Sequence, residues 1–411
     1  MMANNNFVPE IRFKGFTDDW TQRKLGEVSD KSTEKNINNL YTETFTNSAE
    51  FGIIRQRDFF DKDISNEKNL NGYYVVYPDY FVYNPRISNL APVGPVNRNS
   101  LGRIGVMSPL YYVFCVKNCD FTFLEKYFCT TYWHKFMKLN GDNGVRADRF
   151  AIKDSVFQEM PIPLPSTEEQ TAIGTFFRTL DNAIHSHQQK LNHLRELKKG
   201  YLQLMFPQDR EIVPKVRFAG FDGDWLNAQL GDIVEFYSGL TYSPDDVVES
   251  GGTFVLRSSN VQNGEIVNAD NIYVTSDVVN CKNVEIGDIV VVVRNGSRNL
   301  IGKHAQIKET MNETVIGAFM TGLRSTQPRL INALLDTPQF DIEITKNLGA
   351  TINQITVGAF KKMTFAIPSQ IAEQAALGGF FSNLDNQTAT LSSKLEQLKQ
   401  LKAAYLQRMF M

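Results

Sequence analysis

The chain has 411 residues, with 43 basic and 45 acidic side chains and a formal net charge of −2. This length exceeds what one ordinary hydrophobic core covers, so we expect at least two domains. Hydrophobic residues make up 42% and charged residues 21% of the chain, which excludes a disordered protein. No apolar run is long enough to span a bilayer, and no secretory signal opens the sequence. The four cysteines are sparse and unevenly spread, which favours free thiols in a reducing cytoplasm.

The sequence contains an internal duplication. Residues 8–28 and 213–233 are identical at 10 of 21 positions, at an offset of 205. Residues 169–206 and 373–410 are identical at 19 of 38 positions, at an offset of 204. One unit of about half the chain is therefore repeated, and the similar ends frame middle regions that differ.

In the first copy, the leading segment 8–28 is followed by a variable region, residues 29–160. Runs of β-branched and aromatic residues predict strands over 73–77 and 80–83, separated by a Pro-Asp turn, and over 110–116. The mixed character of this region predicts a β-rich domain.

The first copy ends in a long helix. The prolines of 160–165 enforce an extended segment, and Ser166 with Glu169 then forms a capping-box pattern. Apolar residues follow at alternating spacings of four and three, with His187 and Lys198 at the two remaining positions of the seam, up to Pro207. The seam residues of this helix are Ile173, Phe177, Leu180, Ile184, Leu191, Leu194, Tyr201 and Met205.

The second copy repeats this order with the leading segment 213–233, a variable region 234–364 and a final helix. Residues 284–294 predict a turn that enters a buried strand, equivalent to the strand over 80–83. Ala372 stands where a capping glutamate is expected. The seam residues of the second helix are Leu377, Phe381, Leu384, Leu391, Leu395, Leu398, Tyr405 and Met409.

A narrow seam sustained for five heptads indicates a coiled coil, and we expect the two helices to pair antiparallel about a pseudo-twofold axis. In a fully overlapped register, Phe177 approaches Tyr405 and Phe381 approaches Tyr201. A core-facing helix in an ordinary bundle is the alternative.

Polar groups suited to DNA gather near the ends of the predicted strands. Arginine binds guanine bidentately, Asn and Gln bind adenine, and Ser and Lys commonly bind phosphates. The alternative for each residue is a solvated loop. The candidates are Arg55, Arg57, Asn84, Arg86, Arg98, Arg103, Asn143, Arg146, Arg149, Arg257, Ser259, Asn260, Arg294, Asn295, Ser297, Arg298, Lys303, Asn353 and Gln354.

Enzyme signatures are incomplete in this chain. The sequence Asn84-Pro-Arg-Ile lacks the aromatic ring that stacks on a flipped base, and His304 replaces the Ser/Thr of a phosphate-binding loop. His185, His187 and His193 contain no i,i+4 pair that would bind a metal. We therefore expect neither a catalytic nor a metal site.

The whole chain resembles the specificity (S) subunits of type I restriction–modification systems. The resemblance rests on Pro163-Leu-Pro-Ser-Thr-Glu-Glu-Gln170 leading into Phe176-Phe-x-x-Leu-Asp181, on the corresponding 367–385 segment, and on the Arg-Phe-x-Gly-Phe…Trp segments at 12–20 and 217–225. It implies an α+β fold in which two β-rich target recognition domains, in tandem repeat, are joined by two antiparallel coiled-coil helices. The implied division is 1–165 and 207–368 for the domains, and 166–206 and 369–411 for the spacer helices.

The resemblance also implies the function. Each domain would recognise one half of a bipartite, asymmetric site in double-stranded DNA, and the helices would set the spacer between the halves. Two methyltransferase (M) subunits and the restriction (R) subunits would bind this non-catalytic chain in the bacterial or archaeal cytoplasm. Those partners, and not this chain, would use S-adenosylmethionine, ATP and Mg.

The net charge leaves a second hypothesis open, a coiled-coil interaction scaffold that does not bind DNA. Residues 8–165 carry 20 basic and 19 acidic side chains, and residues 213–367 carry 13 and 17. Nonspecific DNA affinity depends on many phosphate contacts, so this balance predicts weak DNA binding by the chain alone.

Overall fold

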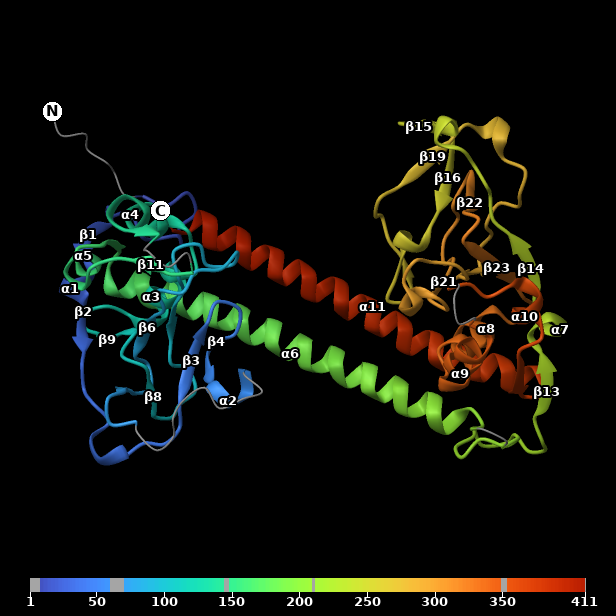
Figure 1. Cartoon of the computed structure of the whole chain (residues 1–411), viewed down its shortest axis with the longest axis horizontal. Helices are drawn as coiled ribbons and strands as arrows, with labels where there is room; N and C mark the ends of the chain where they lie inside the picture. Colours follow the sequence, from blue (N-terminus) through green and yellow to red (C-terminus); the bar gives the residue numbers. More distant parts are fainter. Residues whose placement is uncertain (1–7, 60–69, 144–147, 209–210, 349–352, 411) are drawn as a thin grey trace. The chain divides into compact units, whose positions relative to one another are not determined.

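The computed structural model describes residues 8–59, 70–143, 148–208, 211–348 and 353–410. The chain forms two compact units, one of residues 1–188 and 394–411 and the other of residues 189–393. Two long helices, α6 (Thr167–Met205) and α11 (Ile371–Arg408), each contribute one end to each unit (Figure 1). In the described part of the chain, no helix is long and apolar enough to cross a membrane.

A four-stranded antiparallel sheet forms the centre of the first unit. Its strands lie in the order β2 (Ser29–Ser32), β9 (Tyr112–Val116), β6 (Phe81–Tyr83) and β7 (Val96–Arg98). Phe81 and Phe114 stack across β6 and β9 with ring centroids 5.3 Å apart, and both are fully buried. These aromatic and β-branched runs form strands because each side chain packs against a cross-strand neighbour.

Paired strands and short helices surround this sheet. The strand pairs are β1 (Thr21–Lys24) with β12 (Pro161–Leu164), β3 (Phe45–Ser48) with β4 (Gly52–Arg55), β5 (Tyr74–Val76) with β8 (Gly105–Met107), and β10 (Asp142–Asn143) with β11 (Phe150–Ala151). The helices are α1 (Leu25–Val28), α2 (Gln56–Phe59), α3 (Phe121–Phe128), α4 (Tyr132–Asn140) and α5 (Asp154–Gln158).

The second unit contains a sheet of the same order, β14 (Glu235–Ser238), β23 (Met320–Arg324), β20 (Ile289–Val292) and β21 (His304–Gln306). A further sheet has the order β15 (Val247–Val248), β19 (Ile272–Val274), β16 (Thr253–Leu256) and β22 (Thr314–Ile316). The other elements are the pairs β13 (Leu226–Gln229) with β24 (Thr364–Ile367) and β17 (Val261–Gln262) with β18 (Glu265–Ile266), and the helices α7 (Leu230–Ile233), α8 (Pro328–Leu335), α9 (Pro338–Asn347) and α10 (Val357–Lys361).

The predicted strands exist, but the turn after residue 77 does not form a hairpin. β5 pairs with β8, whereas β6 pairs with β7 and β9. Asp79 in this turn has a left-handed φ of 64°, and the chain passes there from one sheet to the next.

A buried ion pair joins the leading segment of each copy to the start of its long helix. In the first unit, Arg12 donates to both carboxylate oxygens of Glu169 at 2.7 Å. In the second, Arg217 binds Glu373 in the same way at 2.6 and 2.8 Å. The glutamates are 0% and 1% exposed, so each carboxylate depends on its bidentate arginine to replace hydrogen bonds lost from water.

These ion pairs correct two sequence predictions. Ser166 accepts a hydrogen bond from the backbone N–H of Glu169 at 3.3 Å, but the Glu169 side chain binds Arg12, so only half of the capping box forms. The counterpart of Glu169 is Glu373 and not position 372, because Glu373 makes the equivalent ion pair. The second helix therefore keeps the glutamate, contrary to the expectation of a replacement by Ala372.

The ends of α6 and α11 pack antiparallel within each unit. In the first unit, the start of α6 lies beside the last turns of α11, and the rings of Phe176 and Tyr405 are 5.0 Å apart (Figure 1). In the second, Phe380 and Tyr201 are 5.1 Å apart. The tyrosines thus contact Phe176 and Phe380 rather than the neighbouring Phe177 and Phe381, whose rings turn inward to Phe410 and Phe206.

The seam residues differ in how far they are covered. Buried side chains are Ile173, Phe177, Leu180, Leu191, Leu194, Met205, Leu377, Phe381, Leu384, Leu395 and Met409. Half-buried ones are Ile184, Tyr201, Leu391, Leu398 and Tyr405. In each unit the seam joins the core of the β-rich domain, so helix and domain share one hydrophobic cluster.

A glycine lets each domain approach its long helix closely. A Cβ atom on Gly174 would lie 3.0 Å from Asp120 Oδ1, at the start of α3, and a Cβ atom on Gly378 would lie 2.6 Å from the backbone nitrogen of Leu330 in α8. Asp120 also caps α3 by accepting hydrogen bonds from the N–H groups of Thr122 and Phe123. Both glycines occupy the same place in the duplicated sequence.

Equivalent lysine–aspartate pairs connect α6 with α11 in both units. In the first, Lys402 lies 2.6 Å from Asp181, and Lys126 of α3 adds a second cation at 2.8 Å. Burial alone raises the pKa of Asp181, but the hydrogen bonds and charges of the two lysines hold that pKa below its ordinary value.

In the second unit the third charge has the opposite sign. Lys198 binds Asp385 of α11, and it also binds Asp336, which follows α8, at 2.6 Å. Burial raises the pKa of Asp336, but His304 and Lys198 lower it to about 2. The equivalent lysine–aspartate pairs of the two units thus bind different charges. The first pair binds a lysine of its domain, and the second binds an aspartate.

Replacing Arg12 by alanine is expected to lower the free energy of unfolding by about 3–5 kcal/mol, because the carboxylate of Glu169 stays buried without its partner. Denaturant unfolding measures this loss. Arg23→Ala removes an ion pair with Glu27 between side chains that are 61% and 48% exposed, and should cost less than about 1 kcal/mol. Equal losses in the two variants contradict the role of the buried pair.

Candidate nucleic-acid interface

In the first unit, the candidate site begins where β6 ends. Asn84 Oδ1 accepts a hydrogen bond from the backbone N–H of Arg86 at 2.9 Å, and this turn directs the exposed arginine outward. Arg86 and Arg149 form an isolated antiparallel bridge. Two arginines that lie 63 positions apart in the sequence are thus brought together.

A buried amide that the sequence analysis did not single out supports this site. Asn47 is 2% exposed and donates to the carbonyl oxygen of Val82 at 2.7 Å. Its own side-chain oxygen accepts from Asn97 at 2.7 Å, and its backbone oxygen accepts from the Asn84 side chain at 2.8 Å. Nothing in the sequence distinguishes Asn47 from other loop asparagines, because its partners come from distant strands.

Asn47 and Asn84 line a cleft of about 590 Å³ in the first unit. Asn47, Asn84, Arg86 and Arg149 contribute polar groups, and Leu110 contributes an apolar side chain. The cleft thus combines guanidinium and amide donors with an apolar surface, the groups with which proteins contact base edges.

The second unit builds the same arrangement where β20 ends. Asn295 Oδ1 accepts from the backbone N–H of Ser297 at 2.9 Å, and Arg294 forms an isolated antiparallel bridge with Gln354. The Asn353 side chain donates to the carbonyl oxygen of Gly296 at 2.9 Å. The sequence-predicted candidates from 294–298 and 353–354 are therefore neighbours in space.

The charges of these two sites are largely uncompensated. Arg294, Arg298 and Lys303 are exposed and form no ion pair with any residue that the structure describes. In the first unit, Arg86 lies 3.7 Å from Asp148, and both side chains are at least half exposed. Such cations are available to an anionic or electron-rich ligand.

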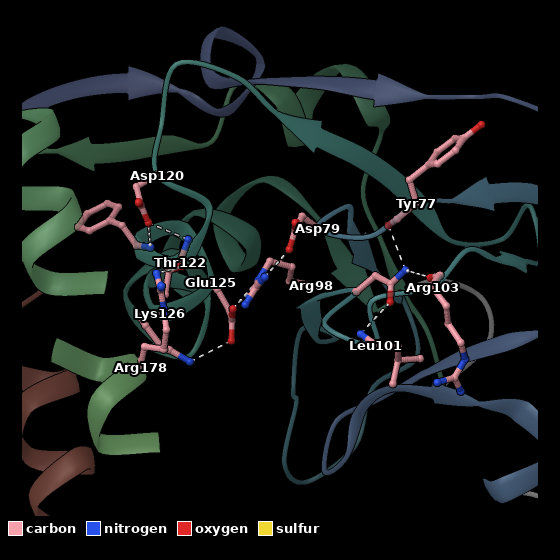
Figure 2. Close-up of polar contacts among 12 residues, drawn as sticks. Tyr77, Asp79, Arg98, Leu101, Arg103, Asp120, Thr122, Glu125, Lys126 and Arg178 are labelled. Atoms are coloured by element: carbon pink, nitrogen blue, oxygen red, sulfur yellow. Dashed lines mark hydrogen bonds and ion pairs between the residues drawn. The ribbon is translucent and has the colours of Figure 1, made fainter. Parts of the chain in front are cut away.

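Other predicted residues instead have partners within their own domain. Figure 2 shows Arg98 between the carboxylates of Asp79 and Glu125, and Lys126 beside Glu125. Arg103 binds Glu43 at 2.9 Å. These arginines have carboxylate partners within the first domain, and DNA contact by them would require the ion pairs to open.

Ser259 and Asn260 are predicted to contact DNA, but the structure buries the polar groups of both side chains. Asn260 is fully buried, and its amide donates to the carbonyl oxygen of Ala269 at 2.8 Å. The Ser259 hydroxyl is also buried. Arg257, just before them, binds Asp270 at 2.5 Å, so its charge has a partner within the second unit.

The remaining candidates lie elsewhere or cannot be placed. Arg55 and Arg57 line a separate hollow in the first unit, together with Glu43. Asn143 belongs to β10, but its side chain is not described, and Arg146 lies outside the described residues.

A sequence model of the type I restriction modification DNA specificity domain matches the chain twice, over residues 17–196 and 222–400. These matches cover more than half of the sequence. The chain therefore belongs to the family of type I restriction–modification specificity subunits, and its fold repeats that domain in tandem.

Curated relatives are distant and only partly matched. The StySPI specificity subunit of Salmonella potsdam is 26% identical over 185 residues, 43% of this chain and 40% of the relative. The MjaVIII specificity subunit of Methanocaldococcus jannaschii is 23% identical over 262 residues, 61% of each protein. The chain thus matches less than two thirds of the length of either relative.

Solved structures share the fold over the full chain. The S subunit of a type I restriction–modification system from M. genitalium has a TM-score of 0.67 at 15% identity, covering 98% of this chain and 99% of that one. A chain from a structural study of assembly and conformational transition of the type I R-M system has a TM-score of 0.51 at 14% identity, covering 97% and 99%.

Replacing Arg294 by alanine is expected to weaken DNA binding by about 1–3 kcal/mol at one half-site and to relax base preference there, because a bidentate contact is lost. Binding titrations of the assembled complex with cognate and single-base-changed duplexes measure this. Lys282→Ala is the matched control, since Lys282 is exposed and pairs with Glu235 at the opposite end of the same sheet. A uniform loss on all sequences would assign Arg294 to phosphate binding instead.

Proposed function

We propose that this chain is the non-catalytic, sequence-reading subunit of a type I restriction–modification complex. Each β-rich unit recognises one half of a bipartite site in double-stranded DNA. The long helices set the spacer between the half-sites and bind methyltransferase subunits. Family membership and the geometry of the two polar sites support this proposal.

The observation that carries the proposal is the repetition of one arrangement in two dissimilar sequences. In each unit an asparagine-held turn follows the central strand, and a strand-like bridge joins an arginine to the segment that returns to the helix. The residues around it differ, with Arg149 in one unit and Gln354 in the other. Two domains that recognise different base sequences require a common scaffold with different side chains at its edge.

The charge of the chain supports a division of labour within a complex. With a net charge of −2 and a few uncompensated arginines, this chain has little capacity for nonspecific phosphate binding. Tight binding is therefore a property of the assembly, in which methyltransferase and restriction subunits supply further contacts. Those partners also supply the chemistry that uses S-adenosylmethionine, ATP and Mg.

Exchanging residues 29–160 for the same region of a family member with another target is expected to change one half of the methylated site only. The reason is that the polar site of the first unit lies entirely within this region. Sequencing of modified adenines in host DNA identifies the site. The reciprocal exchange of 234–364 serves as the control and should change the other half, while a change in both halves after either exchange would rule out two independent readers.

Adding one helical turn to both long helices, four residues after Gln188 and four after Ser393, is expected to lengthen the spacer and keep both half-site sequences. Four residues extend a helix by about 6 Å, roughly one to two base pairs. The same methylation mapping gives the spacer length. In the control, four residues inserted at the exposed Gly251 should leave the spacer length unchanged. An unaltered spacer in the helix variant would refute the role of the helices.

A further inference from the structure

Each unit exposes one large apolar side chain at the same turn beside its polar site. Leu110 is 60% exposed and Phe319 is 52% exposed. Each is the third residue of a hydrogen-bonded turn, closed by Tyr111 N–H to Ser108 O at 3.1 Å in the first unit and by Met320 N–H to Gly317 O at 2.9 Å in the second. β9 and β23, the equivalent strands of the two central sheets, follow these turns.

In the second unit the apolar residue is held firmly against the candidate arginine. The carbonyl oxygen of Phe319 accepts hydrogen bonds from the backbone N–H groups of Val293 at 3.0 Å and Arg294 at 3.2 Å. The guanidinium of Arg294 lies over the Phe319 ring, 5.0 Å from its centroid. One face of the ring is therefore covered, while about half of the side chain remains open to solvent.

In the first unit the apolar residue borders the polar cleft. Leu110 lines the cleft together with Asn84, Arg86 and Arg149. The two units have dissimilar loops, yet Leu110 lines the same cleft as Arg86, and Phe319 lies against Arg294.

We propose that Phe319 and Leu110 are specificity-determining residues that contact the 5-methyl group of a thymine, next to the base pair bound by the neighbouring arginine. This inference rests on the proposed function. On the major-groove edges of the bases, the thymine methyl is the apolar group. It lies beside the hydrogen-bond acceptors that bind arginine. Because Arg294 lies over one face of the Phe319 ring, full insertion of this ring between stacked bases would displace the guanidinium.

The test removes the methyl group from the DNA and the apolar group from the protein in turn. The full chain is assembled with its methyltransferase partner, and its affinity is measured on duplexes in which each thymine of the half-site is replaced by deoxyuridine. At one position, the unaltered chain should lose roughly three- to tenfold in affinity, as expected for one buried methyl contact. Phe319→Ala should bind the thymine duplex more weakly by a similar factor and show no further loss with deoxyuridine.

Two further variants separate this contact from a general effect on folding. Phe319→Leu, which introduces the side chain found in the first unit, should retain the dependence on the methyl group. Ile286→Ala removes a side chain that is 63% exposed and lies before β20, at the opposite end of the sheet from Arg294, and should behave like the unaltered chain.

Several outcomes overturn the inference. They are a half-site without thymine, a Phe319→Ala variant as sensitive to deoxyuridine as the unaltered chain, and a loss in that variant that is equal on all DNA sequences. An assembly that binds all sequences alike would contradict the proposed function itself, so the two failures are distinguishable.

Discussion

The structure of each unit depends on one buried ion pair. Glu169 and Glu373 are among the least exposed charged residues, and an unpaired carboxylate in such a place costs several kcal/mol. Arg12 and Arg217 compensate that cost, and both come from the leading segments of their copies. The leading segment of each copy is thereby fixed to the start of the long helix of that copy. The strand pairs β1–β12 and β13–β24 then join the beginning of each domain to its end.

This framework tolerates variation in the parts that it carries. The glycines at 174 and 378 let α3 and α8 approach the long helices, although the sequences of the two domains differ. The pairs Asp181–Lys402 and Lys198–Asp385 receive Lys126 from one domain and Asp336 from the other. Because each lysine–aspartate pair carries both charges, a domain can bind to the helices through either a cation or an anion. The arrangement explains how one scaffold supports two different polar edges.

The sequence predicts the parts of the molecule that repeat. The helices predicted over 166–206 and 369–411 are observed at Thr167–Met205 and Ile371–Arg408, because the seam spacing and the flanking prolines are local signals. Their antiparallel contacts are also as expected, apart from the exchange of Phe176 for Phe177 and of Phe380 for Phe381. Which of two adjacent phenylalanines turns toward the partner helix depends on the domain packed on the other side, and heptad spacing does not contain that information.

The polar sites are predicted less completely, for a physical reason. Residue type suggests a contact with a ligand. The side chain is free to make that contact only if it has no partner within its own domain. Arg294 and Arg298 are unpaired among the described residues, whereas Arg98 is held by two carboxylates and Asn260 is buried. Asn47 and Phe319 were missed because the features that matter, burial of one and exposure of the other, arise from strands far apart in the sequence.

We propose that two separate units of one chain each specify half of a DNA site. Sequencing of modified adenines in cells that contain the methyltransferase partner, with and without this chain, tests it most directly. We expect one bipartite motif, with two fixed sequences around a gap of unspecified bases, that is present only with the chain. A continuous motif, or a motif that persists without the chain, would contradict the account.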